Sequence, residues 1–335
     1  MRTPRFLAAL ASAFQACVLG RRIPLSVSVE LTDRCNFKCR YCSQTKDGMP
    51  EMTTAQVHSL MDDFCGLGAR RIGLTGGEPL LRADIPDLIA YAKAKGLIVN
   101  LATNGALLAD MAPRLKELDL VLVSLDGSET VHDSLRAPGS YQKAVAGIAA
   151  MRKLGKPVIT STVLTKLNLQ ETGPILELAR DMGFSAMFTL LFNHPRSISR
   201  AEFEKLVPTE EECRKAYQAL IEKKKQGYPV LSSWTFLRYM ANGDYRKRPL
   251  DCKAGDLYCA VDCRGNIGAC GLQLGEAGLP NGCELGFKAA FAKLSRNPCA
   301  RHYCNFGIEE SMILSLRPEA VANFLKHLVL GQAAR

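Results

Sequence analysis

Extended and helical patterns alternate along the chain from residue 24 to about residue 191. Runs of β-branched and other apolar residues predict six strands, at 25–31, 71–75, 97–102, 119–125, 158–164 and 184–191. The segments between them carry apolar residues at helical spacing. Strands that alternate with helices favour a parallel sheet with right-handed crossovers. Because a closed barrel needs eight such units, six predict an α/β fold with a partial (β/α)6 TIM-type barrel.

Local signals mark the helix ends in this region. Thr53 and Gln56 form a capping-box pattern that predicts the start of one helix. Its apolar stripe consists of Val57, Leu60, Met61 and Phe64. A second stripe, at Ile85, Leu88, Ile89 and Ala92, is followed by Gly96, a typical helix C-terminal stop.

The pattern changes after about residue 193. A charged helix is predicted over 209–226, and 252–304 then contains seven of the thirteen cysteines, which predicts a small Cys-rich α+β module. We therefore expect an N-terminal helix at 1–23, a partial barrel at 24–230, and a Cys-rich module with a C-terminal helix at 231–335.

Composition narrows the class of protein. The chain has 335 residues, of which 47% are hydrophobic and 23% charged, as in ordinary globular proteins. The net charge of +10 favours an anionic partner, but no Lys/Arg block or RNA-binding motif is present, so nucleic acid is disfavoured.

The N-terminus resembles an export signal in part. Its apolar run is interrupted by Gln15 and is too short to span a bilayer. Closely spaced cysteines in a long α/β chain indicate metal ligation in a reducing compartment, so we expect a cytoplasmic protein. We expect the N-terminal helix to pack on the end of the barrel. Contact of this helix with a membrane surface, or with substrate as a lid, is the alternative.

Three cysteines, Cys35, Cys39 and Cys42, follow the first predicted strand in the stretch CNFKCRYC. Loops at this end of parallel barrel strands build active sites. A structural zinc site would need a fourth ligand nearby, and the next cysteine, Cys65, is on a predicted helix. Three thiolates instead suit a cubane iron–sulfur cluster in which one iron keeps an exchangeable position.

Together with Gly76-Gly77-Glu78-Pro79 after the second strand, this stretch resembles the radical S-adenosylmethionine (AdoMet) superfamily. The resemblance implies that Cys35, Cys39 and Cys42 hold a [4Fe–4S] cluster whose fourth iron chelates AdoMet. It implies further AdoMet contacts at Tyr41, the aromatic residue before the last cysteine, and at Gly76, Gly77 and Glu78. The glycines would let the backbone approach the methionyl amino group, which Glu78 would also meet.

The likeness extends to about residue 165. Asn104 follows the third strand and Ser124 ends the fourth, where relatives contact the ribose and methionyl parts of AdoMet. Arg136, in HDSLRAPG, is the candidate partner of the AdoMet carboxylate, although many relatives have Arg-Gly where this chain has Arg-Ala. For Asn104 and Ser124, hydrogen bonding within turns is the alternative.

The segment DCKAGDLYCAVDCRGNIGAC predicts a β-hairpin with Cys252 and Cys270 at its open end. Cys299 and Cys304 could complete a four-thiolate site. This arrangement resembles the SPASM and twitch modules, which hold auxiliary [4Fe–4S] clusters. The CxxxxC spacing of the last pair, in place of CxxC, leaves the third and fourth ligands open. A zinc knuckle is the alternative.

Six cysteines remain. We expect Cys259 to be a buried small hydrophobe, and Cys263 and Cys283 to be free unless a second auxiliary cluster uses them. The others, in predicted helices, are expected to be core or surface thiols: Cys17, Cys65 and Cys213.

These resemblances imply an enzyme in which a 5′-deoxyadenosyl radical removes hydrogen from a small-molecule or lipid-like substrate, with an anionic substrate as one option. A flavodoxin or ferredoxin would supply the electron, and the auxiliary cluster would assist oxidation or bond formation. The alternatives are a maturase of ribosomal peptides and a noncatalytic iron–sulfur or zinc protein. Substrate contacts are expected from 190–206, 232–240 and the tail after Cys304.

Overall fold

The computed structural model describes residues 20–42, 50–191, 198–246, 252–295 and 305–333. Cys17, Cys299, Cys304 and most of the expected N-terminal helix therefore lie outside the described residues. In the described part, no helix combines the length and apolar character needed to cross a bilayer.

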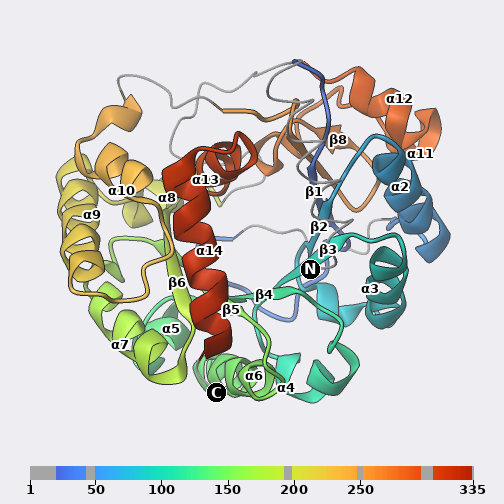
Figure 1. Ribbon diagram of the computed structural model, residues 1–335. Coiled ribbons are helices and arrows are strands. Elements are labelled where there is room, and N and C mark those ends of the chain that lie inside the picture. Colours follow the sequence, from blue (N-terminus) through green and yellow to red (C-terminus); the bar gives the residue numbers. More distant parts are fainter. Residues whose placement is uncertain (1–19, 43–49, 192–197, 247–251, 296–304, 334–335) are drawn as a thin grey trace.

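The predicted parallel strands form a single sheet. They are β1 (Ser26–Glu30), β2 (Arg71–Thr75), β3 (Ile98–Thr103), β4 (Leu120–Ser124), β5 (Val158–Leu164) and β6 (Ser185–Leu190). The sheet has the order β6-β5-β4-β3-β2-β1-β7-β8, and β1 to β6 are parallel throughout. Figure 1 shows it curved within an outer layer of helices. The partial barrel is confirmed.

The Cys-rich hairpin continues this sheet. Its first strand, β7 (Tyr258–Val261), pairs in parallel with β1, and the second, β8 (Ile267–Gly268), turns back antiparallel. The hairpin was predicted, but its union with the barrel was not. Pairing with β7 satisfies the N–H and C=O groups on the edge of β1, which would otherwise have no strand partner.

Helices follow the strands and cover their outer face. The α-helices are α2 (Thr54–Gly66), α3 (Ile85–Ala94), α4 (Leu108–Met111), α5 (Glu129–Leu135), α6 (Ser140–Lys153), α7 (Thr172–Met182), α8 (Arg200–Leu206), α9 (Glu210–Lys225), α10 (Trp234–Ala241), α11 (Gly282–Leu285), α12 (Phe287–Ala292), α13 (Asn305–Leu314) and α14 (Pro318–Ala333). Short 3-10 turns are η1 (Pro79–Leu81), η2 (Ala112–Arg114), η3 (Leu169–Glu171), η4 (Asp244–Arg246) and η5 (Gly271–Gln273).

Two helices begin at capping boxes. The predicted box at Thr53 and Gln56 starts α2, and Thr209 with Glu212 starts α9.

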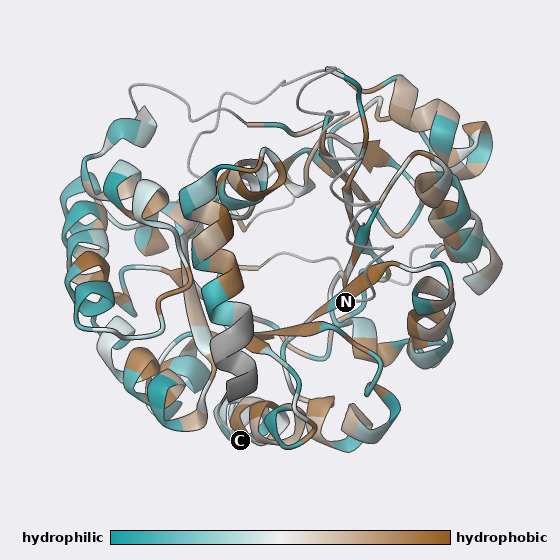
Figure 2. Cartoon of the chain, viewed as in Figure 1, coloured by the Kyte–Doolittle hydropathy of each residue, from teal (hydrophilic) through white to brown (hydrophobic). Residues whose placement is uncertain are grey.

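Figure 2 shows hydrophobic residues along β3 and β4 and hydrophilic residues over much of α9. The main core lies between the outer face of the sheet and the helices, and includes Val27, Leu74, Leu101, Val123 and Phe188.

The C-terminal helices close the amino ends of the barrel strands. His327 of α14 lies 2.9 Å from the hydroxyl of Ser185 at the start of β6, and Glu310 of α13 pairs with Arg71 at the start of β2. The described part of the tail after Cys304 therefore lies at the end opposite to the cysteine loop, and its expected contact with the substrate stays a prediction. In 232–240, Phe236 and Tyr239 are buried in the core.

Candidate active site

The cysteine loop leaves β1 and pairs at once with the GGEP segment. Leu31 donates from its N–H to the carbonyl of Thr75 at 2.8 Å. Gly77 then donates to Thr32 at 2.7 Å, and Glu78 donates to Arg34 at 2.8 Å. The two predicted motifs are thus joined by backbone hydrogen bonds directly before Cys35.

The two glycines are required by this close approach. Gly76 has φ +137°, and a Cβ there would lie 2.4 Å from the carbonyl oxygen of Thr32. At Gly77 a Cβ would lie 2.3 Å from the carbonyl oxygen of Arg34. Both distances are far below van der Waals contact, so any side chain would displace the cysteine loop. Sequence reasoning assigned these glycines to the approach of AdoMet; that role stays a prediction.

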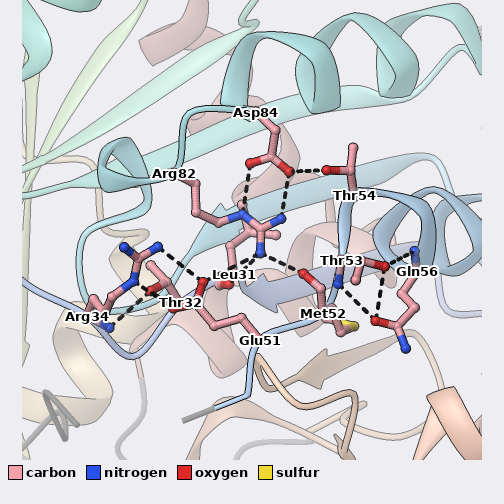
Figure 3. A network of polar contacts seen from close by, with 10 residues as sticks. All are labelled: Leu31, Thr32, Arg34, Glu51, Met52, Thr53, Thr54, Gln56, Arg82 and Asp84. Carbon is pink, nitrogen blue, oxygen red and sulfur yellow. Dashed lines mark hydrogen bonds and ion pairs between the residues drawn. The ribbon is translucent and has the colours of Figure 1, made fainter. Parts of the chain in front are cut away.

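A buried arginine ties the two ends of the cysteine loop together (Figure 3). Arg82, only 7% exposed, donates to the carbonyls of Leu31 at 3.1 Å and Met52 at 2.8 Å. Asp84 holds its guanidinium through two bonds, of 2.9 and 2.6 Å. The loop that carries the cysteines therefore has a fixed base. Sequence reasoning missed this arginine, which lies three residues after GGEP.

A second carboxylate strengthens the base of the loop. Glu51 accepts hydrogen bonds from Thr32 and from Arg34, the latter at 2.9 and 3.2 Å. These contacts join residues on either side of the three cysteines. Glu51 was also missed, because an isolated glutamate in a loop carries no sequence signal.

Nitrogen donors lie beside two of the three sulfurs. The amide of Asn104 is 3.9 Å from Cys35 Sγ, and Arg136 Nη1 is 4.0 Å from Cys39 Sγ. Burial raises the pKa of Cys39 to about 11, while Arg136 acts in the opposite direction. Cys42 is exposed. Donors beside the sulfurs suit bound thiolates, so this set fits the expected iron–sulfur cluster. Among the described residues, no three Cys, His, Asp or Glu side chains are grouped for a single metal ion.

Asp126 joins Tyr41 and Arg136, two of the residues that are expected to contact AdoMet. It is fully buried and accepts hydrogen bonds from Tyr41 Oη and, at 2.5 Å, from Arg136 Nε. Its other oxygen accepts from the backbone N–H of Val163 at 2.9 Å. Burial would lower the pKa of Arg136, but the Asp126 carboxylate raises it above its ordinary value. Sequence reasoning named Tyr41 and Arg136 and missed the carboxylate that joins them.

Replacing Asp126 with alanine should destabilise the fold by about 3–5 kcal/mol, because it leaves Arg136 buried without its counter-ion. The free energy of unfolding, from anaerobic urea denaturation, measures this. The matched control is Asp181→Ala, whose ion pair with Arg180 is exposed, and its effect should be small. Equal effects of the two changes would contradict the role given to Asp126.

Glu78 is buried and turned toward the end of β3. It accepts hydrogen bonds from the hydroxyl of Thr103 at 2.8 Å and from the N–H groups of Asn104 at 2.7 Å and Leu80 at 3.0 Å. Burial raises its pKa. These bonds hold GGEP against β3, and the expected contact of Glu78 with AdoMet stays a prediction.

Asn104 and Ser124 lie at strand ends, as expected. Asn104 Oδ1 accepts from the N–H of Ala106 at 2.9 Å, and its amide donates to Asn36 at 2.7 Å. The turn hydrogen bond proposed as the alternative for Asn104 is therefore present. Ser124 ends β4, opposite Ser161 of β5. Contacts of Asn104, Ser124, Tyr41 and Arg136 with AdoMet remain predictions.

The second cysteine site lies near the amino end of β7. Cys252 and Cys270 both pack against a cluster that contains Ala254, Tyr258 and Ala269. Cys252 Sγ lies 3.1 Å from Tyr258 Oη. Because Tyr258 is paired with Ser26, this site lies at the end of the sheet opposite to Cys35. The expected ligands Cys299 and Cys304 lie outside the described residues.

The remaining described cysteines differ in burial. Cys259 is buried in the core, as predicted, and so is Cys213. Cys263 is buried in the hairpin turn, where burial raises its pKa to about 12, whereas Cys283 is exposed. Cys65 is half-buried and packs against the core.

Sequence comparisons place this site in a known family. Residues 29–179 match the model of the Radical SAM superfamily. An AdoMet-dependent heme synthase of Methanosarcina barkeri is 28% identical, over 74% of this chain and 77% of that protein. Mycofactocin maturase MftC of Mycolicibacterium smegmatis is 30% identical, over 75% of this chain and 65% of the maturase.

Solved structures share the fold. SuiB of Streptococcus suis bound to S-adenosylmethionine superimposes with a TM-score of 0.66 and 14% identity, over 89% of this chain and 76% of SuiB. Native anSMEcpe with AdoMet and the Cp18Cys peptide gives a TM-score of 0.64 and 16% identity, over 92% and 96% of the two chains. These structures show the fold alone. The match of residues 29–179 to the family model, together with the two motifs, shows that the chain belongs to the radical SAM superfamily of iron–sulfur enzymes that use AdoMet.

Proposed function

We propose that the protein is a radical AdoMet oxidoreductase whose substrate lies in the barrel between two iron–sulfur centres. One observation carries this proposal. The cysteine loop follows the carboxyl end of β1, whereas Cys252 and Cys270 lie at the amino end of its partner β7. The five residues of β1 span on the order of 15 Å. A substrate within the barrel would have the radical source on one side and an electron acceptor on the other.

The first centre would be held by Cys35, Cys39 and Cys42. A [4Fe–4S] cluster held there would supply the one-electron reduction of AdoMet that starts hydrogen removal from the substrate. The residues of this chain hold the cofactors in place: Asn104 and Arg136 flank two sulfurs, and Asp126 orients Arg136. The protein must also keep water away from the reacting carbon.

The direct test is release of 5′-deoxyadenosine by anaerobically reconstituted, dithionite-reduced protein. A noncatalytic iron–sulfur or zinc protein would release none. Absence of the product from protein with a loaded cluster would therefore overturn the proposed function. In the cell, we expect a cytoplasmic flavodoxin or ferredoxin to reduce the protein. Residues 24–230 would form the barrel, and residues 231–335 would form the auxiliary module.

Replacing Cys252 with serine should remove about 4 irons per chain, the content of one auxiliary cluster, and leave slow uncoupled AdoMet cleavage. Iron analysis and 5′-deoxyadenosine release measure the two effects. The control Cys65→Ser, in α2, should keep the full iron content. If the wild type and Cys252→Ser both hold a single cluster, the second site is a zinc site or holds no metal.

The substrate class has two candidates. The first is a small-molecule or lipid-like substrate, since no peptide-recognition domain was identified in the sequence. The second is a peptide, and it is favoured by the likeness to mycofactocin maturase MftC and to SuiB, which has also been solved with its precursor peptide SuiA. The inner surface of the barrel bears on this choice.

A further inference from the structure

The inner face of the barrel is most polar on β1, β2 and β3. Alternate residues of each strand face away from the helix-side core and into the barrel. On β4, β5 and β6 the inward residues are of both kinds. Leu120, Leu122, Ile159 and Met187 form one apolar cluster or pack against it, as does Leu231, whereas Ser124, Ser161, Ser185 and Thr189 are polar. On β1, β2 and β3 the inward residues are mostly small or polar, and include Ser28, Glu30, Gly73, Thr75, Asn100 and Ala102.

Gly73 opens space in the middle of this polar part of the inner face. Its backbone does not have a positive φ, and a Cβ there would meet only ordinary contacts, the nearest at 4.0 Å. Neither conformation nor packing therefore requires glycine, although a glycine inside a strand weakens the strand. Its neighbour Ser28 on β1 is exposed, between the buried Val27 and Val29. An exposed side chain in the middle of a strand that is paired on both edges means that the inner face is accessible there.

Asn100 offers an unused hydrogen-bonding group beside this space. It is paired with Gly73 in the sheet and is only 6% exposed, yet its Oδ1 has no hydrogen-bond partner among the described residues. A buried amide oxygen without a partner is costly, by about 1–3 kcal/mol, unless a ligand or water supplies a donor. Ser28, Gly73 and Asn100 thus form a row across three adjacent strands.

The inward positions of β1 to β6 carry one carboxylate and one cation. Glu30 is the next inward residue of β1 after Ser28, and it is paired with Thr75 of β2. At the inward positions of β1 to β6, Arg71 is the single cation; it donates to Ser26 and pairs with Glu310 at the amino end. The net charge of +10 is therefore not carried by this surface. A polycarboxylate would find no free cationic partner on these strands.

We propose that the row Ser28–Gly73–Asn100 is the specificity wall of the substrate site. It accepts a neutral or cationic group that can donate a hydrogen bond, such as an amide. The row lies about 10 Å along the strand from the GGEP segment, as expected for a substrate next to AdoMet. This inference rests on the proposed radical AdoMet function.

The experiment compares 5′-deoxyadenosine release by the reduced holoenzyme with and without a probe, and reports the ratio of the two rates. The probes are a pool of acetylated, amidated hydrophobic dipeptides and the tetracarboxylate coproporphyrin III. For the wild type, the dipeptide pool should raise release by about threefold or more, and the porphyrin should not.

Three variants test the wall. Gly73→Leu, which fills the space, and Asn100→Leu, which removes the amide, should lower the dipeptide ratio to about 1. Gly73→Ala, whose Cβ meets only ordinary contacts, should fold normally and give an intermediate ratio. The control Asn242→Leu, at an exposed position, should keep the wild-type ratio. Melting temperatures show that each variant is folded.

The outcomes separate the two proposals. If the wild type releases no 5′-deoxyadenosine at all, the proposed function fails, and this inference fails with it. If the wild type cleaves AdoMet but responds to the porphyrin and not to the dipeptides, the specificity wall is wrong. The same holds if Asn100→Leu and Gly73→Leu respond to dipeptides as the wild type does.

Discussion

Replacing Cys39 with alanine is expected to reduce 5′-deoxyadenosine release by about 100-fold or more, because the cofactor carries the difficult chemistry and two thiolates cannot hold the cluster. Cys39 is half-buried, and Arg136 Nη1 lies 4.0 Å from its sulfur. Product release under dithionite and the iron content per chain are measured together. Iron should fall by the content of one cluster.

The control for this change is Cys65→Ala, which removes a half-buried thiol from α2 without touching the cysteine loop. It should leave both the iron content and the product yield near the wild-type values. Retention of a full cluster and of AdoMet cleavage by Cys39→Ala would refute the assignment of Cys35, Cys39 and Cys42 as ligands. The hydrogen bonds of Asp126 with Tyr41 and Arg136 would then serve a purpose other than supporting the cluster site.

Replacing Gly77 with alanine is expected to reduce cluster loading by about half or more, although Gly77 is not a ligand. The added Cβ would lie 2.3 Å from the carbonyl oxygen of Arg34, and the loop must move because backbone atoms cannot yield as a flexible side chain can. A displacement next to Cys35 disturbs the first sulfur, and overpacking of this kind costs about 1–3 kcal/mol. Iron content after anaerobic reconstitution measures the effect.

The matched control is Gly173→Ala in α7, where a Cβ would meet nothing within 4 Å. This change should keep full iron content and should stabilise the helix slightly, because alanine is the better helix former. If Gly77→Ala loads iron as well as the control does, the glycine is not needed for the fit of the cysteine loop. A variant that loads iron but fails to cleave AdoMet would instead support the predicted role of Gly77 in AdoMet binding.

Local patterns predicted the strands and helix starts well. The alternation of side chains along β1 places Val27 and Val29 in the core, and α2 begins at the capping box of Thr53. Such features depend on neighbouring residues and on backbone periodicity, which a sequence displays directly. The order of the motifs CNFKCRYC and GGEP along the chain likewise indicated the family.

Long-range contacts were not predictable in the same way. Asp126 and Tyr41 are far apart in the sequence, and so are Arg82 and Leu31, so no local spacing reveals their bonds. The pairing of β7 with β1 also joins distant segments. The edge of β1 would be free without β7, which accounts for the pairing. The sequence does not indicate, however, which edge of the sheet a strand from the C-terminal part will join.

The sequence by itself predicted the chemistry of the first site, because CNFKCRYC and GGEP are local motifs whose order along the chain resembles a known family. Only the tertiary structure decided where the second cysteine pair lies, which end the C-terminal helices close, and which side chains face the inside of the barrel. The net charge of +10 pointed to an anionic partner, yet the inward positions of β1 to β3 carry the carboxylate of Glu30, an Arg71 that is already paired with Glu310, and an Asn100 oxygen without a hydrogen-bond partner among the described residues. Composition sums charges over the whole surface, whereas a substrate meets only those side chains that the strand alternation turns toward it.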